Sequence, residues 1–420
     1  MRRKTAGCAF LFASACLAQP ADAPLTLADC IRLANSVPSA VTVARQEARI
    51  AALGVTAAKS SFLPQANLTG GVIYNSPTAN RQSFVSYNGS REYITQAGLS
   101  LEVDTSGRLR AAYARAKVDQ DLAQTAAQLT ERDLRRAVTI AFYRVLVTRK
   151  LAAASQASLT EALAFETRVR ALLGGGEAAR ADLVKASAQV AAFDQWHRAA
   201  DLDARLANQE LAAYWTADVD TPLNLEDTLD QPAAEPPPDA PSGAFLGRFE
   251  FRLFDLQKRG FSLDAKRERA MLLPQISLGY LYGLDVNRYS WQERGSAVIA
   301  SLNVPIFDWF KARSLAAQFT TRAQQVDNAR QLTERAFSRE YANAKARVAS
   351  VFEQVKVAGD QVKLFEENLS LSQVRYEGGE GPALDVVLAQ TQLQQARANY
   401  FNTLFLYASA RADLEVAAGR

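Results

Sequence analysis

The sequence predicts a mainly α-helical chain with a transmembrane β-barrel part, built from two internal repeats of the order helix–strand–strand–helix–helix. Three observations support this fold class. An apolar stripe with alternating steps of four and three residues occupies 337–376, within a helical stretch over 308–376. Four runs of about ten residues alternate apolar and polar side chains, and the order of elements recurs about 200 positions later. A helix over 308–376 would extend roughly 100 Å at ~1.5 Å per residue, and its 3.5-residue repeat predicts long antiparallel coiled-coil packing.

The start of the chain is typical of a secretory signal. Basic residues at 2–4 precede a short apolar run at 8–17 and then small residues. We expect a signal peptide at 1–18, with cleavage near Ala18 or three to five residues later. Lipidation of Cys16 is the less favoured alternative, because the preceding residues lack the usual leucine three places before the cysteine.

Composition excludes several classes of protein. The formal charge of +4 is too weak to indicate nucleic-acid binding. Cys30 would be the last cysteine of the mature chain, so no internal disulfide is expected, and its apolar helical surroundings predict a buried packing residue. An uninterrupted apolar run of 18 residues occurs nowhere in the sequence, so we expect an exported protein without a transmembrane helix.

The first repeat is predicted to span 19–217. Thr26 is placed to cap the opening helix, and Pro38 is expected to kink or interrupt it. Three glycines at 174–176 should end the long helix. The predicted helices lie at about 26–62, 107–173 and 178–214, and the strands at about 66–74 and 93–103.

A proline-rich linker, 218–245, should separate this repeat from a second one at 246–420. Leu-Pro-Gln at 63–65 recurs at 273–275, where helix again gives way to alternating side chains. The predicted helices of the second repeat lie at about 246–272, 308–376 and 382–418, and its strands at about 275–284 and 296–304.

The strands have the length that a tilted strand needs to cross a bilayer, and tyrosine and tryptophan residues lie near their ends, as in aromatic girdles. A half-buried strand of a soluble sandwich is the alternative for any single one, but four strands joined to such long helices fit a sandwich poorly. Four strands cannot close a barrel, and an open strand edge is not stable in hydrocarbon. Several chains must therefore contribute to one barrel in the lipid of an outer membrane, and the pattern itself allows a dimer, trimer or tetramer.

Catalytic and metal-binding patterns are missing from the sequence. His197 is the one histidine, and a lone histidine is more often a packing or surface residue than a metal ligand. The carboxylates are scattered on helices, mostly with the spacing of solvated pairs. We therefore expect no enzyme activity, no cofactor and no metal.

These motifs, in order and in two copies, resemble the TolC family of outer-membrane channel proteins over nearly the whole mature chain. The Leu-Pro-Gln junctions and the opening pattern at 29–38 are similar to the family's. The segment 304–308 matches its pattern of Pro, an aliphatic residue, Phe and Asp. The segment 101–108 is similar to the version found in channels that serve resistance–nodulation–division pumps.

The family's tip motif of Arg-Tyr, Gly, Asp and Ala is also present in the second repeat. It appears as Arg375, Tyr376, Gly379, Asp385 and Ala389. The first tip departs from it, because Leu occupies position 173, where Tyr is common, and a third glycine is added.

The resemblance implies a homotrimer with a twelve-stranded barrel and an α-helical periplasmic tunnel that closes at its tip. It also implies docking to a periplasmic adaptor and an inner-membrane pump. The expected docking turns, which could equally be simple helix reversals, include Gly174, Gly175, Gly176, Arg375, Tyr376, Gly378 and Gly379.

Asp182 and Asp385 follow these glycine turns and are the candidate channel constriction. One interpretation is that both acids interact with the positive ends of their helices. The other is a ring of carboxylates that narrows the pore of the oligomer and favours cations.

The expected function is the outer-membrane exit duct of a tripartite efflux system for small molecules. One alternative is the outer-membrane component of a type I protein secretion system. An alternative of another class is a secreted coiled-coil scaffold without a pore.

Overall fold

The computed structural model describes residues 24–76, 90–229 and 243–419, so the predicted signal peptide and Cys16 lie outside the described residues. The chain forms two compact units, and each takes segments from both repeats. Of the described residues, the helical unit comprises 24–34, 138–229 and 354–406, and the strand unit comprises 35–76, 90–137, 243–353 and 407–419. The helices α3 (Arg108–Gly175) and α6 (Lys311–Glu377) contribute their N-terminal parts to the strand unit and their C-terminal parts to the helical unit.

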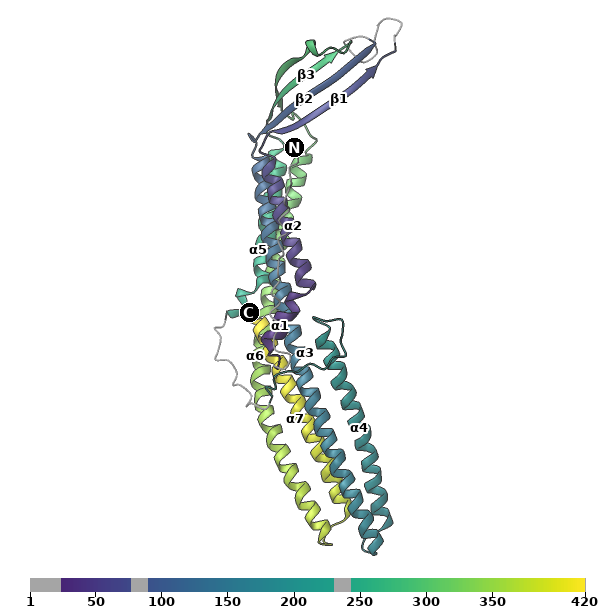
Figure 1. The fold of residues 1–420 in the computed structure, drawn as a ribbon. Coiled ribbons are helices and arrows are strands. Elements are labelled where there is room, and N and C mark those ends of the chain that lie inside the picture. Colours follow the sequence, from purple (N-terminus) through teal and green to yellow (C-terminus); the bar gives the residue numbers. More distant parts are fainter. Residues whose placement is uncertain (1–23, 77–89, 230–242, 420) are drawn as a thin grey trace, which may run out of the picture. The chain divides into compact units, whose positions relative to one another are not determined.

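The strand unit contains an antiparallel sheet in the order β1-β2-β3-β4 (Figure 1). Pairing of β2 with β3 joins the two repeats, whereas β1 and β4 form the two edges. Neither edge pairs with a further strand in the described part of the chain. The strands span Gln65–Tyr74 (β1), Arg91–Val103 (β2), Gln275–Val286 (β3) and Gly295–Asn303 (β4).

The register of the sheet brings the four apolar rows of the sequence onto one face. Leu68 pairs with Ala97, Leu99 pairs with Tyr280, and Tyr280 in turn pairs with Val298. Directly paired residues of antiparallel strands point to the same side, so these side chains form one continuous apolar surface. Leu68 and Val298 are 77% and 79% exposed within the chain. The opposite face carries mainly small and polar residues.

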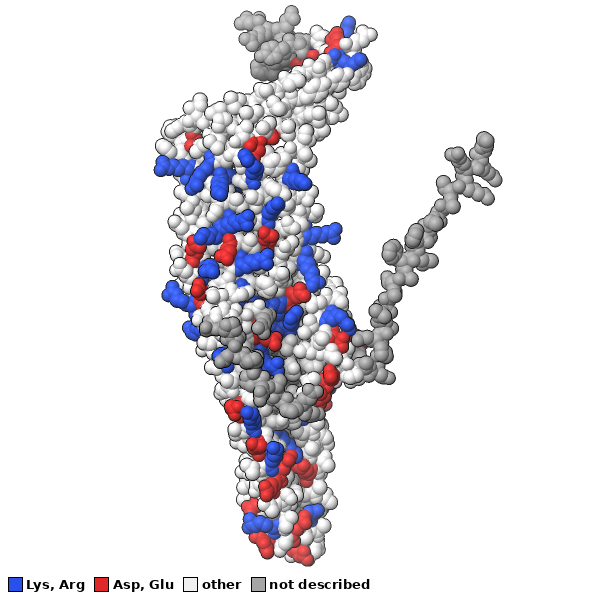
Figure 2. All heavy atoms as spheres, turned by 90° about the vertical axis from the view of Figure 1, so that its left-hand side faces the viewer, with Lys and Arg blue, Asp and Glu red and all other residues white. Residues whose placement is uncertain are grey.

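Charged side chains are distributed accordingly over the strand unit. Figure 2 shows a broad zone nearly free of charged residues at its strand end, followed by a band rich in Lys and Arg on the adjoining helices. This change from apolar to basic surface is typical of proteins at a membrane boundary.

The helices that precede the strands in each repeat follow local features of the chain. α1 (Leu27–Ser36) and α2 (Ala40–Ser60) are separated at Pro38, which has no N–H to continue the helix. α5 (Phe249–Ala270) follows a short 3-10 turn, η1 (Ala244–Gly247). In the strand unit α2, α5 and the first parts of α3 and α6 run alongside one another (Figure 1).

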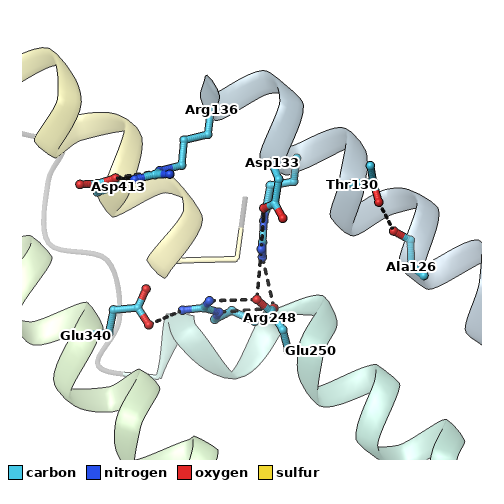
Figure 3. A network of polar contacts seen from close by, with 9 residues as sticks. Ala126, Thr130, Asp133, Arg136, Arg248, Glu250, Glu340 and Asp413 are labelled. Atoms are coloured by element: carbon cyan, nitrogen blue, oxygen red, sulfur yellow. Dashed lines mark hydrogen bonds and ion pairs between the residues drawn. The ribbon is translucent and has the colours of Figure 1, made fainter. Parts of the chain in front are cut away.

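A buried polar network links three of these helices (Figure 3). Arg248 precedes α5 and donates to Glu250 at 2.9 Å, and it forms an ion pair with Glu340 of α6 at 3.2 Å. Arg132 of α3 donates to both carboxylate oxygens of Glu250, at 3.1 and 3.2 Å. The Arg248 guanidinium also lies 3.6 Å from the centre of the Phe337 ring.

The helical unit contains α4 (Arg180–Ala212), the first part of α7 (Ala383–Ala417) and the second parts of α3 and α6 (Figure 1). α1 enters it through a cap in which the Asp29 N–H donates to Thr26 Oγ1 at 3.1 Å, as predicted. Cys30 is fully buried, and burial raises the pKa of its thiol to about 11, so it is a packing residue.

The apolar stripe predicted along α6 is confirmed as its buried seam. All twelve of its members are buried or half-buried. A second row lies outside this seam at seven-residue spacing: Val357, Leu364 and Leu371 are each more than half exposed. α4 likewise exposes apolar side chains at Val184 and Leu206. The helical unit therefore has apolar surface beyond what packing within one chain uses.

Candidate functional site

The two glycine turns of the helical unit have the same hydrogen-bonding pattern. At the end of α3, Gly176 has φ +83°, and the Glu177 N–H donates to the Leu172 carbonyl at 2.9 Å. At the end of α6, Gly379 has φ +73°, and the Glu380 N–H donates to the Arg375 carbonyl at 2.9 Å. Both are Schellman turns, in which glycine supplies the left-handed residue and satisfies the last helical carbonyls.

Tyr376, in the last turn of α6, is partly buried and packs against the apolar cluster next to these turns. Its ring lies 5.3 Å from that of Phe165, centre to centre, at a steep angle. Burial raises the pKa of its phenol, and the negative charge of Asp182 raises it further. The phenolic oxygen is buried and makes no hydrogen bond to the described residues. The fold therefore brings a tyrosine of the second repeat close to an acid of the first.

The apolar cluster around Tyr376 combines both repeats. Its fully buried members come from α3, α4 and α7, and α6 adds Leu369, so the two helix pairs share one core. The buried members are Phe165, Val169, Ala186, Leu369, Ala383, Val386, Ala389 and Leu393.

The two candidate constriction acids occupy similar positions but different surroundings. Asp182 and Asp385 both lie in the first turn of their helices, α4 and α7. Asp182 accepts a bond from Lys185 at 3.4 Å and lies close to Tyr376. Among the described residues, no side-chain hydrogen bond or ion pair of Asp385 is found. The structure brings Asp182 and Tyr376 together, but it gives no contact between Asp182 and Asp385.

Other charges at the turns are partly paired. Arg168 of α3 forms an ion pair with Glu377, the last residue of α6. Both side chains are about half exposed, so this pair contributes at most ~1 kcal/mol. Arg375 is exposed, and Gly174, Gly175 and Gly378 have open space or only loose contacts around them. These turns consequently present free surface and little bulk.

Sequence reasoning missed the polar contacts between the repeats. Gln189 of α4 donates to Thr391 of α7 at 2.9 Å, and Ser158 of α3 donates to Gln394 of α7 at 2.7 Å. Gln390 is 1% exposed, and its amide makes no hydrogen bond to the described residues. The signal was present in the sequence as glutamine and threonine close to the apolar stripe of α7, but their partners depend on how the two repeats pair.

The described residues contain no cluster of three or more His, Cys, Asp or Glu side chains able to hold a metal ion. His197 lies 3.3 Å from Ser155 through Nδ1 and Oγ. Among the helices in the described ranges, none is long and apolar enough to cross a membrane.

Comparison with known proteins agrees with this architecture. The model of a family described as "Outer membrane efflux protein" matches residues 33–217 and 255–420. Among curated protein sequences, none matches the chain.

Solved structures match over nearly the whole chain. The Campylobacter jejuni CmeC outer membrane channel has a TM-score of 0.84 at 17% identity, covering 94% of this chain and 85% of that one. The open state of the Neisseria gonorrhoeae MtrE outer membrane channel has a TM-score of 0.81 at 19% identity, and the match covers 94% of this chain and 88% of that one. The outer membrane protein VceC from Vibrio cholerae has a TM-score of 0.78 at 15% identity, and the match covers 94% of this chain and 96% of that one. At these identities the likeness shows the fold.

Proposed function

The chain belongs to the outer membrane efflux protein family, whose members are channels and not enzymes, and we propose that three copies of it form one exit duct. Each copy would supply four strands to a closed twelve-stranded barrel in the outer membrane. The helices would form a tunnel in the periplasm. Small molecules would enter this tunnel from the periplasm or from an inner-membrane pump and leave the cell passively.

The observation that carries this proposal is the open sheet of the strand unit. Its edges, β1 and β4, pair with no further strand of the described chain, and one face is apolar and exposed. In hydrocarbon every backbone N–H and C=O needs a partner, so such a sheet is stable there only when its edges pair with other copies. Twelve strands also leave a lumen that four or eight cannot.

The helices support the same assembly. The exposed row on α6 at seven-residue spacing and the exposed apolar residues of α4 are suited to pack against helices of neighbouring copies. Packing between copies would thus continue from the barrel into the tunnel.

We assign the tunnel's gate to the glycine turns and to Asp182 and Tyr376, whose side chains influence each other electrostatically. Tyr376 fixes the end of α6 in the shared apolar cluster, and Asp182 lies on the first turn of α4. Separating the two repeats at this end would expose the Tyr376 ring and move the carboxylate away from the phenol. A periplasmic adaptor that binds the exposed turns could provide the energy for this separation, because the turns themselves contain little bulk to displace.

The assembly is tested by native mass spectrometry of the detergent-solubilised protein, where a trimer is expected and a soluble monomer would refute the proposal. The gate is tested in planar bilayers with Asp182→Ala and Asp385→Ala. We expect Asp182→Ala to raise conductance and both changes to reduce cation preference. Lys185→Ala is the matched control, since it removes the partner of Asp182 but keeps the acid. Unchanged conductance and selectivity in both variants would reject the constriction.

Docking is tested separately in cells. Replacing Gly379 with leucine adds bulk at an exposed turn and should weaken resistance to toxic small molecules while the trimer stays intact. Full resistance in that variant would contradict a docking role. Loss of a secreted protein without any loss of resistance, after deletion of the gene, would instead indicate protein secretion.

A further inference from the structure

The turn between β4 and α6 exposes an unusual amount of apolar surface. Ile306 is 96% exposed, Trp309 is 83% exposed, and Phe307 and Phe310 are each 62% exposed. We propose that this turn, 306–310, is a membrane anchor that lies in the headgroup region of a phospholipid leaflet at the helical end of the barrel. The proposal rests on the proposed function, because it requires β4 to be in the bilayer.

The turn continues the lipid-facing surface of β4. Val298 and Leu302 belong to the apolar face of the sheet and are 79% and 65% exposed. Val304 and Ile306 extend this series at two-residue intervals beyond the last strand residue, Asn303. The apolar row therefore does not stop where the strand stops, and its last members lie between the strand and the charged helices.

The aromatic residues are held in a backbone conformation that their side chains disfavour. Trp309 and Phe310 have φ values of +54° and +60°, in the left-handed region that bulky residues rarely adopt. Their rings pack on Phe307, with ring centres 4.9 Å and 6.0 Å apart. A compact aromatic cluster is thus kept at a position where a glycine would fit the backbone better.

The equivalent turn of the first repeat is built differently. Between β2 and α3, Gly107 supplies the positive φ, +78°. Thr105 donates to the Pro274 carbonyl at 2.8 Å, and Asp104 accepts from the Leu109 N–H at 3.0 Å. This turn is polar and its groups are bonded within the chain. One repeat therefore uses glycine at its strand-to-helix turn, whereas the other presents aromatic residues to the surroundings.

Cations follow the aromatic cluster directly. Lys311 and Arg313 are exposed, and neither side chain forms an ion pair with another described residue. They lie at the start of α6, and the helices of the strand unit carry further Lys and Arg side chains on the face that Figure 2 shows. Aromatic rings at the boundary of the acyl chains, followed by cations at the level of the phosphates, match the layers of a phospholipid leaflet.

Tryptophan fluorescence with brominated lipids tests the anchor. The chain has four tryptophans, so Trp196, Trp215 and Trp291 are replaced with phenylalanine to leave Trp309 alone. The trimer is reconstituted into phosphatidylcholine vesicles with bromine at acyl carbons 6,7 or 11,12. We expect emission of Trp309 to fall about twofold or more, with the shallow bromines quenching more strongly.

Two matched single-tryptophan proteins provide the controls. Val298→Trp in a chain without the four native tryptophans should be quenched more strongly by the deep bromines, because it lies on the apolar face of β4. Trp196 alone, in the helical unit, should not be quenched. If a single-tryptophan chain does not assemble, the same quantity is obtained as the difference between the wild type and Trp309→Phe.

The outcomes separate the anchor from the duct itself. Quenching at position 298 without quenching of Trp309 overturns the anchor and indicates that a neighbouring copy or water covers the turn. Absence of quenching at both positions shows that β4 is not in the bilayer, and then the proposed function fails as well. Quenching of both, in the expected order of depth, supports the anchor.

Discussion

Replacing Glu250 with glutamine should destabilise the strand unit far more than the same change at Glu340. Glu250 lies between two buried guanidinium groups, since the side chains of Arg248 and Arg132 are only 5% and 8% exposed (Figure 3). Glu340 contacts the same Arg248 at 3.2 Å, but its own side chain is half exposed. Each variant thus removes one carboxylate from the same network. The carboxylate of Glu250 is largely buried, whereas that of Glu340 is half exposed.

The magnitude follows from the pKa of Glu250. Burial by itself raises this pKa, but hydrogen bonds from Arg248 and Arg132 outweigh it and lower the value from 4.5 to about 2. A shift of this size corresponds to about 3 kcal/mol of folding free energy at neutral pH, at ~1.4 kcal/mol per pKa unit. Leaving a buried cation without its partner costs a similar amount. For Glu340→Gln we expect at most ~1 kcal/mol.

The sign of the pH dependence provides a second test. Because the pKa of Glu250 is lower in the folded state, its contribution is complete above pH 4.5 and is lost as the pH falls from 4.5 towards 2. Unfolding by guanidinium chloride, followed by circular dichroism in detergent at pH 7 and pH 2.5, measures both effects. The difference in unfolding free energy between the wild type and Glu250→Gln should be much smaller at pH 2.5 than at pH 7. The reasoning would be refuted if Glu250→Gln and Glu340→Gln lost the same unfolding free energy at pH 7. It would also be refuted if the loss in Glu250→Gln did not depend on pH.

Three further predictions concern packing and backbone geometry. Gly283→Ala should abolish assembly of the barrel, because the added Cβ would lie 2.0 Å from the Thr95 carbonyl oxygen. Gly279→Ala is the control and should assemble normally, since no atom lies nearer than 3.8 Å to its Cβ. Gel electrophoresis of heated and unheated samples shows which variants assemble, because an assembled barrel changes its migration on heating. Gly379→Ala should lower the unfolding free energy by about 1 kcal/mol, because alanine disfavours the φ of +73° at this position. An unchanged melting temperature would contradict this. Leu393→Ala, at 2% exposure in the shared cluster, should cost about 2–5 kcal/mol, and limited proteolysis of the helical unit should then accelerate.

Patterns with a regular period could be predicted from the sequence. The buried seam of α6 follows the 3.5-residue stripe, and the apolar rows of the strands coincide on one face because their register preserves the two-residue alternation. The break at Pro38 follows from its missing N–H. Each of these properties depends on neighbours in the sequence or on a single repeated period.

Contacts between distant segments could not be predicted in the same way. The proximity of Asp182 to Tyr376 depends on how the first repeat pairs with the second, and neither residue's local sequence encodes this pairing. The positive φ values of Trp309 and Phe310 contradict local preference, which would place glycine there. Arg248 has an ordinary sequence context, and it becomes a buried cation only because three helices meet around it.

The two glycine turns show how one substitution makes an otherwise repeated structure asymmetric. Gly176 and Gly379 have the same conformation, and Asp182 and Asp385 lie at the same distance from them along the chain. Tyr376 therefore corresponds to Leu173, whose aliphatic side chain cannot interact with a carboxylate as a phenol can. Each protomer consequently has one phenol near the carboxylate of a helix start where a perfect repeat would have two. In the proposed trimer this makes three such pairs, all between the end of α6 and the start of α4, so in the proposed gate these two helix ends would move apart on opening.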